Sequence, residues 1–115
     1  MINDADMSKE FEDAGSIYPK VEVELIERKM GTVVVDVHQV PNTTTLVGTA
    51  ILPVRDGEHP IKFTLCTEIM ACVDPRNFNR ELGEKYLKEK VLASAKNELW
   101  KLEGYALACK MSEGE

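Results

Sequence analysis

The sequence predicts an α+β fold in which an antiparallel sheet of four to five strands packs on one long C-terminal helix. The first observation behind this prediction is the alternation of two side-chain sets along Ile61–Val73, which is typical of one long strand with a packed side. The second is a change of period after Asp74, where apolar residues recur every three or four positions, as in a helix. The length of 115 residues allows a single domain with a modest core.

The chain divides into three parts by composition. We predict a flexible acidic N-terminal arm over residues 1–18, a single α+β domain over residues 19–111 and a disordered tail over residues 112–115. Within the N-terminal arm, Ser8–Asp13 is expected to form one helical turn. The N-terminal arm ends at Tyr18-Pro19, because a residue before proline is driven toward an extended backbone.

Three further strands are expected upstream of Ile61–Val73. Val21–Ile26 alternates apolar residues with glutamate, Thr32–Val40 alternates between two faces, and Thr45–Leu52 carries apolar residues on both sides. Asp56-Gly57 follows as a tight hairpin turn, because this pair accepts the positive φ angles that such turns need.

The helix is expected to begin at Asp74-Pro75, because aspartate is a preferred N-cap residue and proline suits the first helical position. It should end near Trp100 or Leu102, with Gly104 as its C-terminal stop. Beyond that glycine, the alternation in Tyr105–Met111 favours a final edge strand over a helical extension.

The apolar residues of this helix fall into two stripes, whereas a helix that lies on one sheet needs only one. The second stripe, or the apolar sheet face around Val47 and Ile51, therefore predicts a contact between the subunits of a homo-oligomer. The alternative is that one chain buries both stripes, between its sheet and its C-terminal segment. The first stripe comprises Phe78, Leu82 and Tyr86, and the second comprises Leu87, Val91, Ala95, Leu99 and Leu102.

The charge balance is acidic, with 20 acidic and 14 basic residues and a net charge of −6. Because nucleic-acid backbones are bound by clustered lysine and arginine, long DNA or RNA is not expected as a partner. No apolar run is long enough to span a bilayer, and the polar start of the chain differs from a signal peptide. We therefore expect no membrane association and a cytoplasmic location.

The residues that most often carry catalysis or bind metals are scattered. Cys66, Cys72 and Cys109 are expected to be free thiols in a reducing compartment. His38 and His59 are isolated in sequence and do not show zinc-site spacing with the cysteines. Since no Ser-His-Asp, Cys-His, Walker-type or paired-carboxylate arrangement can be assembled, we expect no enzyme and no metal or cofactor.

The start of the predicted helix is the segment best suited to binding a ligand. Its unpaired backbone N–H groups and positive dipole end favour anions, and Arg76 and Arg80 add guanidinium groups. Phe78 or Tyr86 is suited to stacking on a base, and Asn77 to reading a base edge. These five residues predict a site for a small anionic nucleotide-like ligand. The alternative leaves the arginines in solvent, Asn77 in a helix cap and Phe78 in the core.

Two motifs resemble a family of small phage proteins named for gene products forty-nine and sixty-six of two enterobacterial phages. They are ACVDP-x-NF-x-x-E-x-G-x-K, from Ala71 to Lys85, and LW-x-LEGY, from Leu99 to Tyr105. The resemblance is close over about the last third of the chain and weaker upstream, through the Thr-rich turn at Pro41–Thr45. It implies a phage origin and the cytoplasm of an infected bacterium as the location. Most members of the family carry no assigned activity.

In size and layout the chain is also similar to phage sponge proteins that remove the cyclic nucleotide or cyclic ADP-ribose messengers of bacterial defences such as Thoeris. This resemblance implies a non-enzymatic binding protein that sequesters a small nucleotide-derived immune signal and so counters host defence. Two alternatives remain: an inhibitor or adaptor that binds a host protein, and a structural or replication accessory protein. The expected partners are a second copy of the chain, together with a small anionic nucleotide-like ligand or a host protein.

Overall fold

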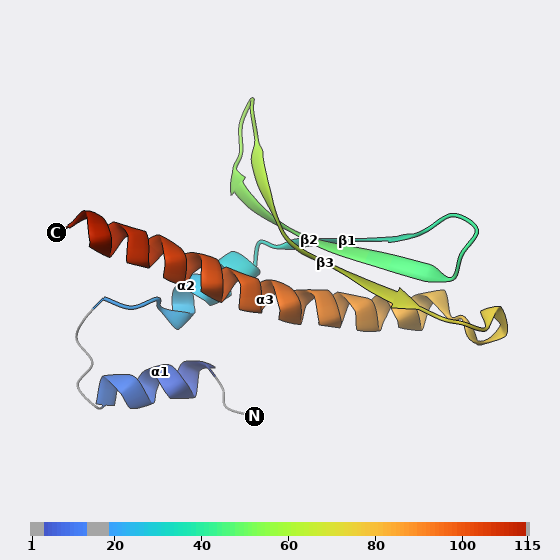
Figure 1. Cartoon of the computed structure of the whole chain (residues 1–115), viewed down its shortest axis with the longest axis horizontal. Helices are drawn as coiled ribbons and strands as arrows, with labels where there is room; N and C mark the ends of the chain where they lie inside the picture. Colours follow the sequence, from blue (N-terminus) through green and yellow to red (C-terminus); the bar gives the residue numbers. More distant parts are fainter. Residues whose placement is uncertain (1–3, 14–18, 115) are drawn as a thin grey trace.

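The computed structural model describes residues 4–13 and 19–114, which form a three-stranded antiparallel sheet packed on a long C-terminal helix (Figure 1). The predicted α+β class is confirmed, but the described residues form three strands instead of the predicted four to five. The elements in chain order are helix α1 (Asp4–Asp13), helix α2 (Val23–Met30), strands β1 (Val34–Gln39), β2 (Thr45–Arg55) and β3 (Ile61–Ala71), the short 3₁₀ helix η1 (Pro75–Asn77) and helix α3 (Arg80–Glu113).

The central strand of the sheet is β2, which pairs antiparallel with β1 on one side and with β3 on the other. Partners across the strands share a face, and Val37, Gly48 and Glu68 form one such row. The face that carries this row is covered by α3, which runs along it (Figure 1). Two side chains of α3 bind Glu68: the Ser94 hydroxyl donates at 2.8 Å, and the Lys90 ammonium lies at 3.7 Å.

The opposite face, called here the outer face, has no helix packed on it among the described residues. Val34 and Ile69 are each 57% exposed there. Because cross-strand partners point the same way, the register fixes which side chains belong to this face. They are Val34, Asp36 and His38 of β1, Thr45, Val47, Thr49 and Ile51 of β2, and Thr64, Thr67, Ile69 and Ala71 of β3.

The core lies between α3 and the inner face of the sheet. The second predicted stripe of α3 enters it, because Leu87, Val91, Ala95 and Leu99 are at most 1% exposed and pack against β2 and β3. The prediction that these four residues lie between subunits is therefore wrong, since one chain buries them, whereas Leu102 of the same stripe is 38% exposed. The first stripe remains partly exposed, and the outer face around Val47 and Ile51 stays a predicted subunit contact.

Val21–Ile26, predicted as a strand, is not one, because most of it lies at the start of helix α2. Val23 and Ile26 are buried and Met30 packs against the core, so the apolar positions that matter are spaced by three and four residues. This spacing is hard to recognise in the sequence, because Val21, Val23 and Leu25 also recur at every second position. The glutamate, arginine and lysine residues between them are good helix formers, whereas strands are depleted in glutamate and lysine.

Tyr105–Met111, also predicted as a strand, forms part of α3 instead. The helix continues through Gly104, where the predicted stop is absent and a Cβ would meet no atom within 4 Å. The segment is rich in alanine, leucine, lysine and methionine, whose helix propensity outweighs a short alternation without a partner strand. Ser112 and Glu113, assigned from the sequence to the tail, are the last residues of the helix.

The connection from β3 to α3 contains two helix starts where the sequence predicted one. The Asp74 carboxylate accepts a hydrogen bond from the backbone N–H of Arg76 at 3.0 Å, as expected for an N-cap, but it caps only η1. The chain then returns to an extended backbone, and the Asn79 side chain accepts from the backbone N–H of Leu82 at 3.1 Å. The long helix therefore begins at Arg80, with Asn79 as its cap.

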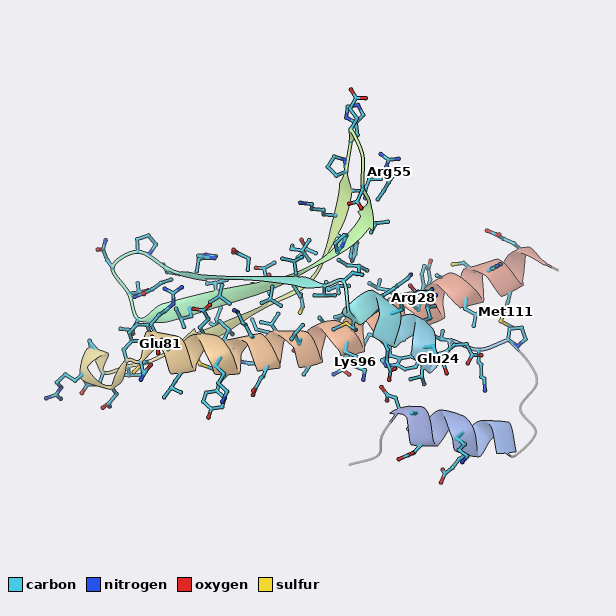
Figure 2. All side chains as sticks on the ribbon, turned by 180° about the vertical axis from the view of Figure 1, so that it is seen from behind. Glu24, Arg28, Arg55, Glu81, Lys96 and Met111 are labelled. Carbon is cyan, nitrogen blue, oxygen red and sulfur yellow. The ribbon has the colours of Figure 1, made fainter. Side chains whose placement is uncertain are left out.

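Beyond the sheet, β2 and β3 continue as a two-stranded hairpin, called here the arm and comprising residues 52–63. β1 pairs with β2 only as far as Ile51. Two bulges bend the continuation, because Leu65 and Val54 have no partner in the register. The bulge at Leu65 also reverses the faces, so Phe63 and Ile69 lie on opposite sides although the alternation placed them together. The arm rises away from α3 (Figure 1), and Arg55 lies near its tip (Figure 2).

The N-terminal helix α1 contacts the middle of α3 through Asp4. Its carboxylate accepts a hydrogen bond from the Trp100 indole at 3.2 Å and pairs with the Lys96 ammonium at 3.2 Å. The helix covers ten residues, more than the single turn predicted at Ser8–Asp13. The rest of the predicted N-terminal arm, residues 1–3 and 14–18, lies outside the described residues, as does residue 115.

Candidate functional site

The start of α3, where the sequence predicted a ligand site, lies beside the turn between β1 and β2 and the end of β3. Hydrogen bonds join these segments: the Thr44 hydroxyl donates to the carbonyl of Cys72, and the Cys72 N–H donates to the Thr44 carbonyl at 3.4 Å. Residues 28 positions apart therefore form one wall beside the helix start.

Three of the five predicted site residues, Asn77, Phe78 and Tyr86, line one pocket of about 310 Å³. Its walls also include apolar side chains of β2 and β3, namely Leu46 and Met70. Phe78 packs against the core, and Tyr86 is 52% exposed. One ring therefore forms a fixed wall of the pocket, while the other remains accessible to a ligand.

Gly83 also lines this pocket and faces Leu46. A Cβ at Gly83 would lie 3.0 Å from the Leu46 Cδ1 atom, which is tighter than ordinary contact. The absence of a side chain at position 83 therefore lets the helix approach β2 at the pocket.

The two predicted arginines do not line this pocket. The Arg76 guanidinium binds the Asp74 carboxylate, with its Nη2 atom 2.7 Å from Oδ2, and these hydrogen bonds lower the pKa of Asp74. Arg80 lies 3.5 Å from a Glu84 carboxylate oxygen and donates to the Gln39 side-chain carbonyl at 3.3 Å. Both guanidiniums are thus already engaged, in surface contacts next to the pocket.

A second hollow of about 540 Å³ lies on the other side of the Thr44–Cys72 wall. It is lined by Gln39, by the threonines of the β1–β2 turn and by Pro75. Thr44 and Cys72 line both hollows, so the two share a wall. Neither Gln39 nor Cys72 was predicted as a site residue. Gln39 reaches the helix start only through the sheet register, whereas Cys72 lies close to the helix start in the sequence. The Thr-rich turn was the one available signal.

The surroundings of Cys66, outside the two hollows, disfavour the reactive form of its thiol. Cys66 is half-buried, and its thiol lies 3.5 Å from the Val91 carbonyl. Burial, together with the charges of Glu68 and Glu98, raises the pKa of the Cys66 thiol, so little nucleophilic thiolate forms at neutral pH. All three cysteines are free thiols, as predicted.

The histidines lie on different elements from the cysteines. His38 is on the outer face, with its Nδ1 atom 3.4 Å from an Asp36 carboxylate oxygen, and His59 is near the tip of the arm. In residues 4–13 and 19–114, no group of three or more His, Cys, Asp or Glu side chains is arranged to hold a metal ion. Over the same residues, no helix has the length and apolar character needed to cross a membrane.

Comparison with known proteins gives one match. No curated protein and no solved structure matches the chain. The sequence model of one phage family, in contrast, matches residues 19–111, which covers α2, the whole sheet and α3 as far as Met111. This range includes both motifs that carried the resemblance. The chain therefore belongs to the phage protein (N4 Gp49/phage Sf6 gene 66) family.

Proposed function

We propose that this phage protein is a non-enzymatic binding protein whose pocket at the start of α3 takes up a small nucleotide-derived immune signal. The signal would be of the cyclic nucleotide or cyclic ADP-ribose type, and its sequestration would counter host defence. The observation that supports this proposal is the gathering of Asn77, Phe78 and Tyr86 around one pocket. Asn77 ends η1, Phe78 follows it directly in the chain, and Tyr86 lies in α3.

The pocket has the character of a base-binding site. Its volume of about 310 Å³ is at the lower end of the range for small-molecule sites, and apolar walls with a few polar groups are typical of them. A base stacked on an aromatic ring gains about 1–3 kcal/mol. The exposed ring of Tyr86 offers such a surface, and the Asn77 amide offers both a donor and an acceptor.

The arginines beside the pocket are suited to exchange partners when an anion arrives. The side chain of Arg76 is 89% exposed in its pair with Asp74, and solvent-exposed ion pairs contribute little to stability. Hydrogen bonds from guanidinium to phosphate are charge-assisted and can be bidentate. A phosphate at the pocket mouth would therefore compete with Asp74 for Arg76, and with Glu84 for Arg80.

The test is titration calorimetry and thermal unfolding with cyclic AMP, cyclic di-AMP and cyclic ADP-ribose. A probe at 100 times its Kd should stabilise the fold by about 2.7 kcal/mol through mass action. Arg80→Glu should abolish this stabilisation. It should leave the unliganded melting temperature within a few degrees, since an exposed substitution usually changes stability by less than about 0.5 kcal/mol.

A matched pair of tyrosines separates the pocket from the rest of the helix. Tyr86→Leu removes the ring that borders the pocket, whereas Tyr105→Leu makes the same change at a 72% exposed position of α3 outside it. Tyr86→Leu should weaken probe binding at least tenfold, and Tyr105→Leu should leave it unchanged. If none of the three probes binds the wild-type chain, the proposal is wrong.

Binding of a host protein is a second candidate function, favoured by the apolar surface that the sheet and the arm expose. Val34 and Ile69 on the outer face are each 57% exposed, and Val54, Ile61 and Phe63 on the arm are between 45% and 61% exposed. Exposed apolar side chains that cluster typically mark protein-interaction sites.

This candidate is tested by affinity purification from infected cells, followed by reconstitution with each purified host protein that is recovered. A host inhibitor should lose its partner with Ile69→Asp, on the outer face. It should keep the partner with Leu92→Asp, a 38% exposed apolar position on α3. Equal recovery by the two variants would count against a protein-binding role for the sheet.

A further inference from the structure

One edge of the sheet is open, and the ladder shows which backbone groups point into it. The Val40 N–H donates to the Thr45 carbonyl at 2.9 Å, so these residues form a hydrogen-bonded pair. Antiparallel ladders alternate between hydrogen-bonded and non-hydrogen-bonded pairs. Every second residue before Val40 therefore also bonds to β2, namely His38, Asp36 and Val34. The N–H and C=O groups of the residues between them, Val35, Val37 and Gln39, point away from the sheet.

The opposite edge of the sheet is partly covered. On β3 the same alternation turns Thr67, Ile69 and Ala71 outward, and the Lys90 ammonium of α3 donates to the Ile69 carbonyl at 3.3 Å. Among the described residues, no side chain bonds to the outward backbone groups of Val35, Val37 and Gln39. Exposed edges in monomeric proteins are blocked by bulges, prolines or charged side chains, lysine above all. β1 contains no bulge, proline or lysine, and Asp36 is the only Asp, Glu, Lys or Arg residue in it.

We propose that β1 pairs antiparallel with β1 of a second copy of this chain, which joins two three-stranded sheets into one six-stranded sheet around a two-fold axis. The outward groups of Val35, Val37 and Gln39 can bond only to outward groups of the other strand. The proposed register places Val37 opposite the partner's Val37, and Val35 opposite the partner's Gln39. The surface is distinct from the pocket, so this proposal does not depend on the proposed function.

The polar side chains Asp36 and His38 of the outer face favour this register. With Val37 on the axis, Asp36 lies opposite the partner's His38 in a non-hydrogen-bonded pair, where side chains are closest. The symmetry creates this pair twice. Moving one strand by two residues would instead place Asp36 opposite the partner's Asp36, or His38 opposite the partner's His38. Two carboxylates directly opposite each other repel, whereas a carboxylate opposite an imidazole can accept a hydrogen bond from a ring N–H.

The first test measures the mass of the full chain in solution by light scattering and sedimentation at tens of micromolar. The wild type should give twice the 12.9 kDa of one chain. Val37→Pro should give the monomer, because proline removes an outward N–H that β2 does not use, and edge strands tolerate such a proline. Thr67→Pro is the matched control, since it removes an outward N–H on the opposite edge and should leave the dimer intact.

A wild-type monomer would overturn the proposal, and so would a Val37→Pro variant that remains dimeric. Circular dichroism and the melting temperature of Val37→Pro establish that the variant is folded. Should it fail to fold, Val37→N-methylvaline, introduced by chemical ligation, removes the same N–H without the proline ring. A dimer in that variant would likewise overturn the proposal.

The second test addresses the register through the proposed pair of Asp36 with the partner's His38. His38→Asp places two carboxylates opposite each other on each side of the axis and should weaken the dimer at least tenfold. The double variant Asp36→His with His38→Asp exchanges the two residues, keeps a carboxylate opposite an imidazole on each side and should restore the dimer. If the single variant dimerises like the wild type, or if the exchange fails to restore the dimer, the register is wrong.

Discussion

Gly48 determines how closely α3 approaches the sheet. A Cβ at this position would lie 2.8 Å from Val91 Cγ2 and 3.1 Å from Leu87 Cγ, and both of these side chains are fully buried. They belong to the four-residue repeat of α3 that forms the core, so neither can move without opening a gap elsewhere. The glycine in the middle of the central strand is therefore a packing requirement.

Gly48→Ala should lower the free energy of unfolding by about 1–3 kcal/mol, the usual range for an extra methyl group in a packed core. Gly104→Ala is the matched control, because a Cβ there meets no atom within 4 Å. It should stabilise the protein by up to about 1 kcal/mol, since glycine is a poor helix former. Urea unfolding measures both, and a stabilising Gly48→Ala would contradict the packing described here.

At the same scale, the sequence predicted part of the candidate site. The aromatic rings and Asn77 were identified because they cluster near a helix start, and the pocket brings Asn77, Phe78 and Tyr86 together. The engagement of the arginines was not predicted. Arg80 bonds to Gln39, which is 41 positions away, and that proximity follows from the sheet register. The pairing of Arg76 with Asp74 was easier to predict, because only one residue separates them in the sequence.

At the scale of elements, the strand predictions are correct for segments that pair with a neighbouring strand. They are wrong for two segments with a period-two pattern but no partner strand. Thr45–Leu52 and Ile61–Val73 correspond to β2 and β3 within three residues at each end. Val21–Ile26 and Tyr105–Met111 show a similar alternation but are helical. Alternation over six or seven residues fits both structures, and the good helix formers in both segments decide between them.

The beginning of α3 depends on Asn79, whereas the sequence pattern predicts Asp74 as the cap. The Asn79 side chain accepts from the Leu82 N–H at 3.1 Å and satisfies one of the unpaired donors of the first turn. The extended backbone at Phe78 separates the two caps. It lets η1 turn the chain before the helix starts, which places Asn77 and Phe78 beside the pocket.

Asn79→Ala should therefore cost about 1 kcal/mol, the typical loss when an N-cap side chain is removed. Asn97→Ala makes the same substitution at an exposed position inside α3 and should be neutral or stabilising by a few tenths of a kcal/mol, because alanine is the better helix former. Thermal unfolding monitored by circular dichroism compares the two. The cap assignment would be refuted if Asn97→Ala proved the more damaging.

At the scale of the whole molecule, the fold is elongated. Its radius of gyration is 18.1 Å, whereas a compact domain of this length has one of about 13 Å. The end of α3 and the arm extend beyond the layer in which sheet and helix pack (Figure 1). Buried apolar residues concentrate between the sheet and the helix. Ten apolar side chains in the described residues are buried, and of these only Leu52 belongs to the arm. Much of the chain therefore lies outside the packed core.

The arm beyond Pro53 should consequently be dispensable for folding. Pro53 and Lys62 are partners in the register, so Val54–Ile61 can be replaced by Asn-Gly, which closes a two-residue hairpin turn. All eight removed residues are exposed, and the variant should melt within a few degrees of the wild type. Differential scanning calorimetry gives the comparison. Because the arm lies at the opposite end of β2 from the pocket and does not form the β1 edge, nucleotide binding and the proposed dimer should both persist. A loss of more than about 2 kcal/mol would show that the arm is covered in solution, since such losses require buried or bonded groups.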